Sequence, residues 1–174
     1  MGRNVPENAG VRLAGRMALV AVVVGTSVTV SATERVTVSL VVAGTIGWSF
    51  VPVLQVLTGL LLIRGRGRQT RISLLDRYFA LGWPWALWIV GVHAALLMWP
   101  GGRRLGLLVV AATAAIPILW TLRLLLDFSR RELGFDTRQA QIRVGQHQAV
   151  SYILFLIYVF FAVSLWPRVV GLFA

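Results

Sequence analysis

Hydrophobic residues along the chain gather in long runs separated by short polar segments, instead of alternating with polar residues. The runs have about the length at which a helix crosses the hydrocarbon core of a bilayer. Five spans are predicted, over residues 17–32, 38–63, 78–99, 105–126 and 149–172. Residues 1–16 are expected to form a cytoplasmic leader, and residues 17–174 a single transmembrane domain. The predicted fold is therefore an all-α integral membrane protein, a bundle of five transmembrane helices.

The segment "VTVSATERVTVSLVV" at residues 28–42 would suggest a β-hairpin in water, because β-branched residues favour strands. In lipid an open hairpin leaves backbone groups without partners, so helices on both sides of a short turn are predicted. An alternative for the first run is a secretory signal cleaved after Ala32. In the second run Pro52 predicts a kink. Ser73 and Asp76 fit the S-x-x-D pattern of a helix start, and Gly134 with Asp136 predicts a helix that begins near Thr137.

Composition supports a membrane protein over a soluble one. The chain has 57% hydrophobic and 13% charged residues, against roughly 25% charged in ordinary soluble domains. The net charge of +11 would point to nucleic acid in a soluble protein. In a membrane protein it indicates loops that stay cytoplasmic, so no nucleic-acid partner is expected. Cysteine is absent, which excludes disulfides and thiolate metal sites.

The distribution of arginine predicts the topology. With the N-terminus inside, thirteen arginines fall on the cytoplasmic side: residues 3, 12, 16, 64, 66, 68, 71, 77, 123, 130, 131, 138 and 143. Four fall outside: Arg35, Arg103, Arg104 and Arg168. This bias predicts an odd number of spans, N-in and C-out, in a bacterial-type inner (plasma) membrane. The central loop with Arg64, Arg66, Arg68, Arg71 and Arg77 is also expected to hold anionic lipid headgroups.

Few polar residues in the spans are candidates for chemistry. Ser49 and Gln55 flank Pro52, where a carbonyl freed by the kink would complete a polar site of the kind that transporters use. The simpler interpretation is that Gln55 joins two helices and that Ser49 bonds its own helix. His93 is a third intramembrane candidate, either a ligand or proton relay or a hydrogen-bonded packing residue.

Cofactor and enzyme chemistry is not expected. His93 and His147 differ in depth by most of a bilayer, so they are not expected to ligate one haem. The chain has no H-E-x-x-H, G-x-S-x-G or Walker motif. We therefore expect no catalytic residues, no metal and no cofactor.

Small residues predict helix packing. Ser39, Ala43 and Gly47 form one stripe at four-residue spacing, and Ala111 with Ala115 forms another. Such stripes let helix backbones approach closely. Arg123, Asp127 and Arg131 share one helix face and are expected to form an interfacial ladder of ion pairs rather than a catalytic site.

Five closely spaced helices, two basic internal loops and the N-in, C-out topology resemble the Yip1 family over about residues 15–172. No clear copy of that family's Asp-Leu-x-Gly-Pro signature is present, so none of its functional residues is carried over. The resemblance implies a non-enzymatic scaffold or accessory subunit with a membrane-protein partner or a homo-oligomer. The alternative is a small transporter or channel component.

Overall fold

The computed structural model describes residues 8–64, 68–98 and 103–164, and all regular secondary structure in these ranges is helical. The helices are α1 (Ala9–Thr33), α2 (Val38–Trp48), α3 (Phe50–Leu62), α4 (Arg68–Ala80), α5 (Trp83–Met98), α6 (Arg103–Thr113), α7 (Ala115–Arg131) and α8 (Thr137–Ser164). Five stretches are long and apolar enough to cross a membrane: Ala9–Ser31, Val38–Leu62, Arg71–Met98, Leu108–Arg131 and Thr137–Phe161. The all-helical class and the five apolar helices are as predicted.

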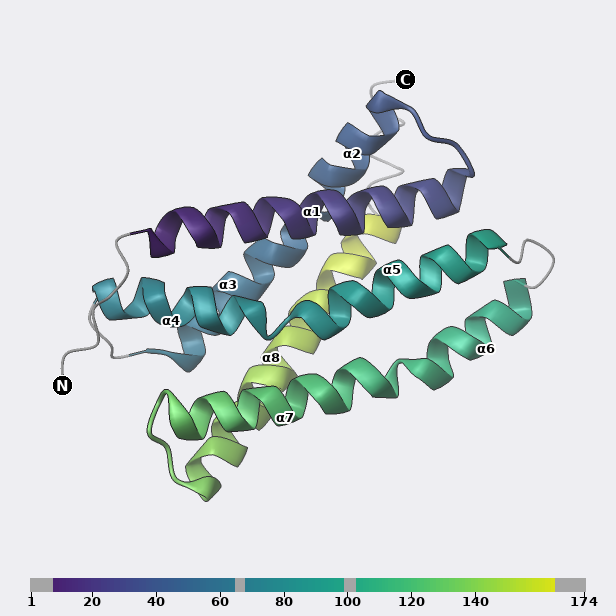
Figure 1. Cartoon of the computed structure of the whole chain (residues 1–174). Helices are drawn as coiled ribbons and strands as arrows, with labels where there is room; N and C mark the ends of the chain where they lie inside the picture. Colours follow the sequence, from purple (N-terminus) through teal and green to yellow (C-terminus); the bar gives the residue numbers. More distant parts are fainter. Residues whose placement is uncertain (1–7, 65–67, 99–102, 165–174) are drawn as a thin grey trace.

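Successive spans run in opposite directions (Figure 1). The starts of α1, α4 and α8 therefore gather at one end of the bundle, together with the ends of α3 and α7. We call this the arginine end. Its described arginine side chains belong to residues 12, 16, 64, 71, 77, 130, 131, 138 and 143.

The three middle spans are each broken just before a proline. The breaks lie at Ser49, at residues 81–82 and at Ala114, and the prolines are Pro52, Pro84 and Pro117. In every case the preceding helix ends four residues before the proline, at Trp48, Ala80 and Thr113. In a continuous helix the backbone N–H of each residue donates to the carbonyl four residues earlier. Proline has no N–H to donate, and its ring clashes with that carbonyl. The kink predicted at Pro52 is thus one of three equivalent breaks.

Several helix ends lie beyond the ranges expected from hydropathy. α1 begins at Ala9, inside the expected leader, and α7 continues to Arg131. Long arginine side chains can reach water while the backbone stays helical, so charge does not end a helix at the membrane surface. α8 begins at Thr137 as predicted, and Asp136 caps it, since its Oδ1 accepts a hydrogen bond from the Gln139 N–H at 2.8 Å. Positions 165–172 of the expected fifth span lie outside the described residues.

The predicted helix start at Ser73 and Asp76 is wrong. α4 begins at Arg68, which places both residues in the second and third turns of the helix. Sequence pattern does not distinguish a capping aspartate from one that pairs with a neighbouring helix, because both follow the same local spacing.

The predicted turn between the first two spans is present, with Glu34 in the left-handed region (φ 56°) and Thr37 capping α2.

Most of the tightly packed core lies toward the arginine end. One cluster joins Leu62, Ile63, Leu74, Leu75, Tyr78, Leu125, Phe128, Leu133 and Val144 from α3, α4, α7 and α8 and their connections. A second joins α1 to α4 through Val20, Val24 and Phe79. α7 contributes a buried stripe at helical spacing, consisting of Pro117, Thr121, Leu125 and Phe128. This end is therefore a protein core, whereas much of the surface farther along the bundle is apolar and exposed.

Candidate functional site

A buried carboxylate at the arginine end ties α4 to α1. The Asp76 side chain is only 5% exposed, and Arg12 Nη2 lies 3.1 Å from its Oδ2. Arg16 Nη1 lies 3.0 Å from Oδ1 and donates a hydrogen bond to the Asp76 main-chain carbonyl at 2.7 Å. Arg16 thus contacts the carboxylate electrostatically while its aligned hydrogen bond goes to the backbone. A buried carboxylate needs such partners to offset its desolvation.

Three polar side chains from three helices meet at Tyr78, two residues after Asp76 on α4. The Tyr78 hydroxyl of α4 lies 2.6 Å from His147 Nε2 of α8 and 3.3 Å from Thr58 Oγ1 of α3. All three residues are buried, with exposures of 2–6%. Gly59 gives the tyrosine ring its room, because a Cβ there would lie 2.5 Å from Tyr78 Cε1. This polar core joins helices that are far apart in the sequence, and local patterning gave no signal for it.

A salt bridge at the same end connects α4 to the segment after α7. Arg77 Nη1 lies 2.6 Å from Glu132 Oε2. Among the other arginines of the central loop, Arg64 and Arg71 are exposed. The side chains of Arg66 and Arg68 lie outside the described residues. Part of the predicted headgroup-binding cluster thus faces outward, and Arg77 is engaged within the protein.

The structure does not bring the predicted intramembrane polar residues together. Gln55 Nε2 donates to the carbonyl of Phe79 at 3.1 Å, beside the break between α4 and α5. Gly82 packs against the Gln55 amide so closely that a Cβ would overlap it. Gln55 therefore bonds a carbonyl near the Pro84 break, not one at Pro52. It joins two helices, as the simpler interpretation held.

The other two candidates bond within their own helices. Ser49 Oγ donates to Ile46 O at 2.7 Å, and His93 Nδ1 lies 2.7 Å from Ile89 O. His147 instead directs Nε2 to Tyr78. Within the part of the chain that the structure describes, no group of three or more His, Cys, Asp or Glu residues is placed to hold a metal ion.

Trp88, for which the sequence suggested no role, links α5 to the break in the fourth span. Its Nε1 donates to Thr113 Oγ1 at 3.0 Å. Thr113 in turn donates to Val109 O at 2.6 Å. The tryptophan therefore acts as a polar cross-link between helices, and it remains partly exposed.

α1 and α2 cross closely at glycines that do not belong to the predicted stripes. A Cβ at Gly25 of α1 would lie 2.5 Å from the Gly44 carbonyl oxygen of α2. Ser39, Ala43, Ala111 and Ala115 are exposed instead. A Cβ at Gly47 would meet no atom of the described chain within 4 Å. The spacing of small residues predicted close packing on α2, but the face that packs on α1 is the one that contains Gly44.

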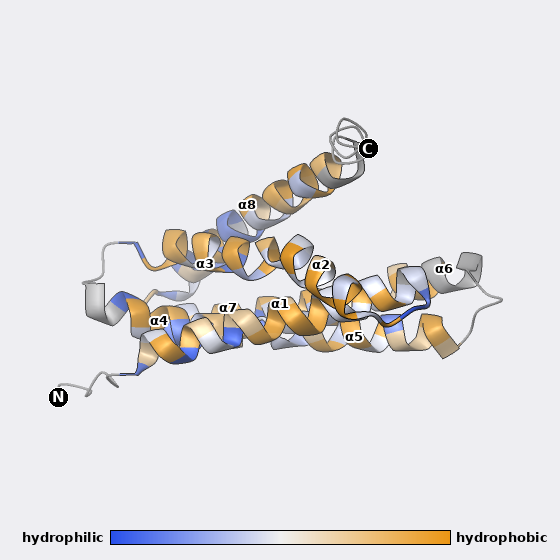
Figure 2. Cartoon of the chain, turned by 90° about the horizontal axis from the view of Figure 1, so that it is seen from above, coloured by the Kyte–Doolittle hydropathy of each residue, from blue (hydrophilic) through white to orange (hydrophobic). Residues whose placement is uncertain are grey.

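The second half of α8 has almost no packed face. Its large hydrophobic residues from Tyr152 to Phe161, Tyr158 apart, are 36–64% exposed. Figure 2 shows this helix leaving the other spans at an angle. Tyr158 makes the main contact between this half of α8 and the other helices. The Tyr158 hydroxyl donates to Gly47 O at 2.7 Å, and the Tyr158 ring stacks on Phe50 with 3.2 Å between centroids. Ten consecutive residues cover every side of a helix, so this exposure is not confined to one stripe.

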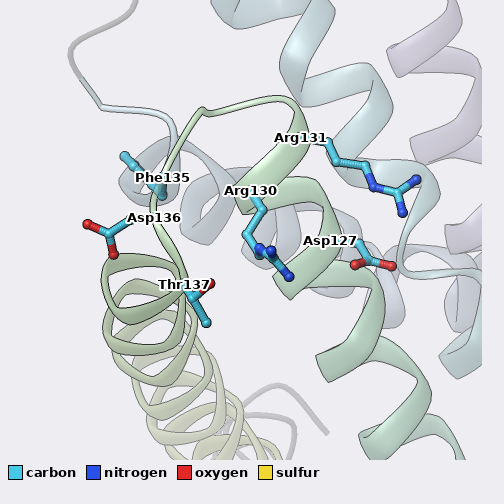
Figure 3. A pocket seen from close by; sticks show the side chains of 6 residues that line it. All are labelled: Asp127, Arg130, Arg131, Phe135, Asp136 and Thr137. Atoms are coloured by element: carbon cyan, nitrogen blue, oxygen red, sulfur yellow. The ribbon is translucent and has the colours of Figure 1, made fainter.

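Between α7 and α8 lies an open hollow of about 460 Å³. It is lined by Asp127, Arg130, Arg131, Phe135, Asp136 and Thr137 (Figure 3). Asp127 forms no ion pair with Arg123 or Arg131 in the structure, so the predicted ladder of ion pairs is not formed among these three described residues.

Comparison with known proteins adds no relative: no protein-family model matches the chain, and neither the curated proteins nor the solved structures give a match.

Proposed function

We propose that this chain is a non-enzymatic multi-pass membrane protein that acts as a scaffold or accessory subunit for a membrane partner. The observation that carries the proposal is the exposed, apolar second half of α8. The first half of α8 is held in the core by Ala140, Val144 and His147, and the second half is largely exposed apart from its attachment through Tyr158. An anchored helix with unpacked sides is suited to receiving a transmembrane helix of another subunit.

A second feature supports docking at the same place. The Gly47 carbonyl accepts the hydrogen bond from the Tyr158 hydroxyl. A Cβ added at Gly47 would meet no described atom within 4 Å, so the space beside its Cα is open. With Ala43 and Ser39 it forms an exposed small-residue stripe on α2. In lipid, helices associate through close van der Waals packing, which small residues allow. We therefore place the partner helix against this stripe and α8, whether it comes from a different protein or from a second copy.

The proposed topology is N-in and C-out in a plasma membrane of bacterial type. Its support is the gathering of arginines at one end of the bundle, since basic loops resist translocation. The same end would face anionic headgroups, each surface arginine contributing about 1 kcal/mol. The resemblance to the Yip1 family agrees with a five-span protein without catalytic activity.

Photocrosslinking in native membranes tests the proposal. Leu156 and Phe160 are the most exposed of the large hydrophobic residues described on α8. A photoreactive residue at Leu156 should give one product of defined mass and fixed stoichiometry. Gly47→Leu should reduce that product, because its side chain fills the space needed by the partner. Gly91→Leu is the matched control, since Gly91 on α5 is equally open but lies on another helix.

The mass of the product identifies a second copy or a different protein. Only lipid adducts at Leu156, with an unchanged yield in Gly47→Leu, would show that α8 merely faces the bilayer.

A small transporter is the second candidate, because three spans are broken next to prolines and Gln55 binds a carbonyl at one break. Transporters use such discontinuous helices to coordinate solutes. Gln55→Leu separates the two functions. Loss of a solute uptake activity with stability retained favours the transporter, whereas unchanged uptake and partner recovery favour the scaffold.

A further inference from the structure

Side-chain hydrogen bonds join the breaks of the three middle spans to one another. Gln55 Nε2 donates to the Phe79 carbonyl at 3.1 Å, and Trp88 Nε1 donates to Thr113 Oγ1 at 3.0 Å. Both donors lie about one turn beyond the proline of their own span. Both acceptors lie just before the break of the next span along the chain. The three breaks are thus connected in chain order by two bonds.

Packing differs on the two sides of the later breaks. On the arginine-end side, Leu75, Tyr78 and Phe79 of α4 belong to the buried clusters. On the other side none of residues 87–98 of α5 is buried, and neither is any of residues 108–113 of α6. Segments with few buried contacts open more readily than a packed core. The breaks at 81–82 and at Ala114 therefore separate a packed end from two loosely packed helices (Figure 1).

The segments beyond the breaks are not held equally. α2 is held to α1 at Gly44 and to α8 at Gly47. α5 is held near its base, where the partly buried Ile89 packs against a cluster of α1 and α4. α6 is held least, since Thr113 is the one polar side chain in its residues 108–113 and bonds Trp88. Freedom to bend is therefore greatest in α5 and α6.

From this arrangement we infer that α5 and α6 tilt together on the packed arginine end, bending at residues 81–82 and at Ala114. A break at proline lacks a backbone hydrogen bond, so a change of angle costs less there than in a continuous helix. The Gln55 bond fixes the angle at the first break. The bond between Trp88 and Thr113 passes a change of that angle to α6. Such hinges need only a few residues at the ends of elements to change their dihedral angles.

This device is separate from the proposed partner site, because that site lies on α2 and α8. It is a property of the fold that both a scaffold and a transporter could use. Its test is therefore a measurement of distance within the chain, not of partner recovery or uptake.

Double electron–electron resonance on the detergent-purified full chain measures the tilt, and the absence of cysteine lets spin labels be introduced directly. Exposed Leu97 of α5 or exposed Leu108 of α6 is labelled together with exposed Gln141 on the packed half of α8. Gln55→Leu should broaden or shift the distance distributions of both pairs. With Thr113→Val added, Gln55→Leu should still change the Leu97 pair but should no longer change the Leu108 pair.

Thr113→Val alone keeps the shape of the side chain and removes the acceptor for Trp88. It should broaden the Leu108 pair, because α6 then loses its bond to α5. Trp120→Phe is the matched control, since this exposed tryptophan lies on α7 at the arginine-end side of the break.

The inference is overturned if Gln55→Leu leaves the Leu108 pair as it is in Trp120→Phe, because the breaks are then rigid kinks or are not connected. It is also overturned if Gln55→Leu changes the Leu108 pair equally with and without Thr113→Val, since the bond between α5 and α6 then transmits nothing. A response of the Leu108 pair that depends on Thr113 supports it.

Discussion

The Tyr78 hydroxyl of α4 lies 2.6 Å from Nε2 of His147 in α8, a hydrogen bond between buried residues 69 positions apart. It joins the first half of the last helix to α4, while Tyr158 joins the second half to Gly47 of α2. Thr58 adds α3 to the same group. Because the second half of α8 is attached chiefly through Tyr158, the orientation of the helix also depends on the contacts at the arginine end.

Tyr78→Phe removes the hydroxyl and leaves a buried imidazole nitrogen without a partner. We expect a loss of about 1–3 kcal/mol of stability, measured as a lower Tm in detergent. Tyr152→Phe is the control, since Tyr152 lies on the same helix as His147 but is exposed. Equal Tm values for the two variants would show that the Tyr78–His147 bond contributes little to the fold.

Asp76→Asn should destabilise the chain more than Arg12→Gln. The aspartate is the buried member and faces two arginines, whereas the Arg12 side chain is 50% exposed and regains hydration when the pair is broken. The expected loss for Asp76→Asn is about 1–3 kcal/mol. Thermal unfolding of both variants checks the order, with the exposed Glu34→Gln as control. A larger effect of Arg12→Gln would contradict it.

Gly44→Leu and Gly47→Leu should separate folding from partner binding. Gly44 faces Gly25 at a distance that leaves no room for a side chain, so leucine there should force α1 and α2 apart and lower the Tm. Gly47 is open, so leucine there should leave the Tm unchanged and reduce partner recovery. Equal loss of Tm in both variants would mean that Gly47 also packs inside the bundle.

Reporter fusions test the proposed topology. Fusions after Arg66 and Arg138 should report the cytoplasm, and fusions after Gly102 and Ala174 the opposite side, because the basic segments resist translocation. Localisation by compartment-specific reporter activity provides the measurement. Reversal at two of the four sites would overturn the five-span, N-in arrangement.

The sequence by itself determined that the chain is helical and has five helices long and apolar enough to cross a membrane. Both follow from local properties of the sequence. The apolar runs have the length of a membrane span, and a backbone in lipid must form its hydrogen bonds within its own segment. Proline acts in the same local way, which is why the break at Pro52 was predictable and those at Pro84 and Pro117 follow the same rule. The start of α8 at Thr137 was also local, since Asp136 caps it.

Only the tertiary structure decided which side chains meet. Ser73 and Asp76 matched a capping pattern, yet Asp76 pairs with Arg12 and Arg16 from a helix 60 residues earlier. The small-residue spacing on α2 pointed to Gly47, while the rotation of that helix puts Gly44 against α1. The polar contacts at Tyr78 and the hollow between α7 and α8 depend on helix rotation and crossing. These are set by the packing of all the helices together, which no single segment encodes.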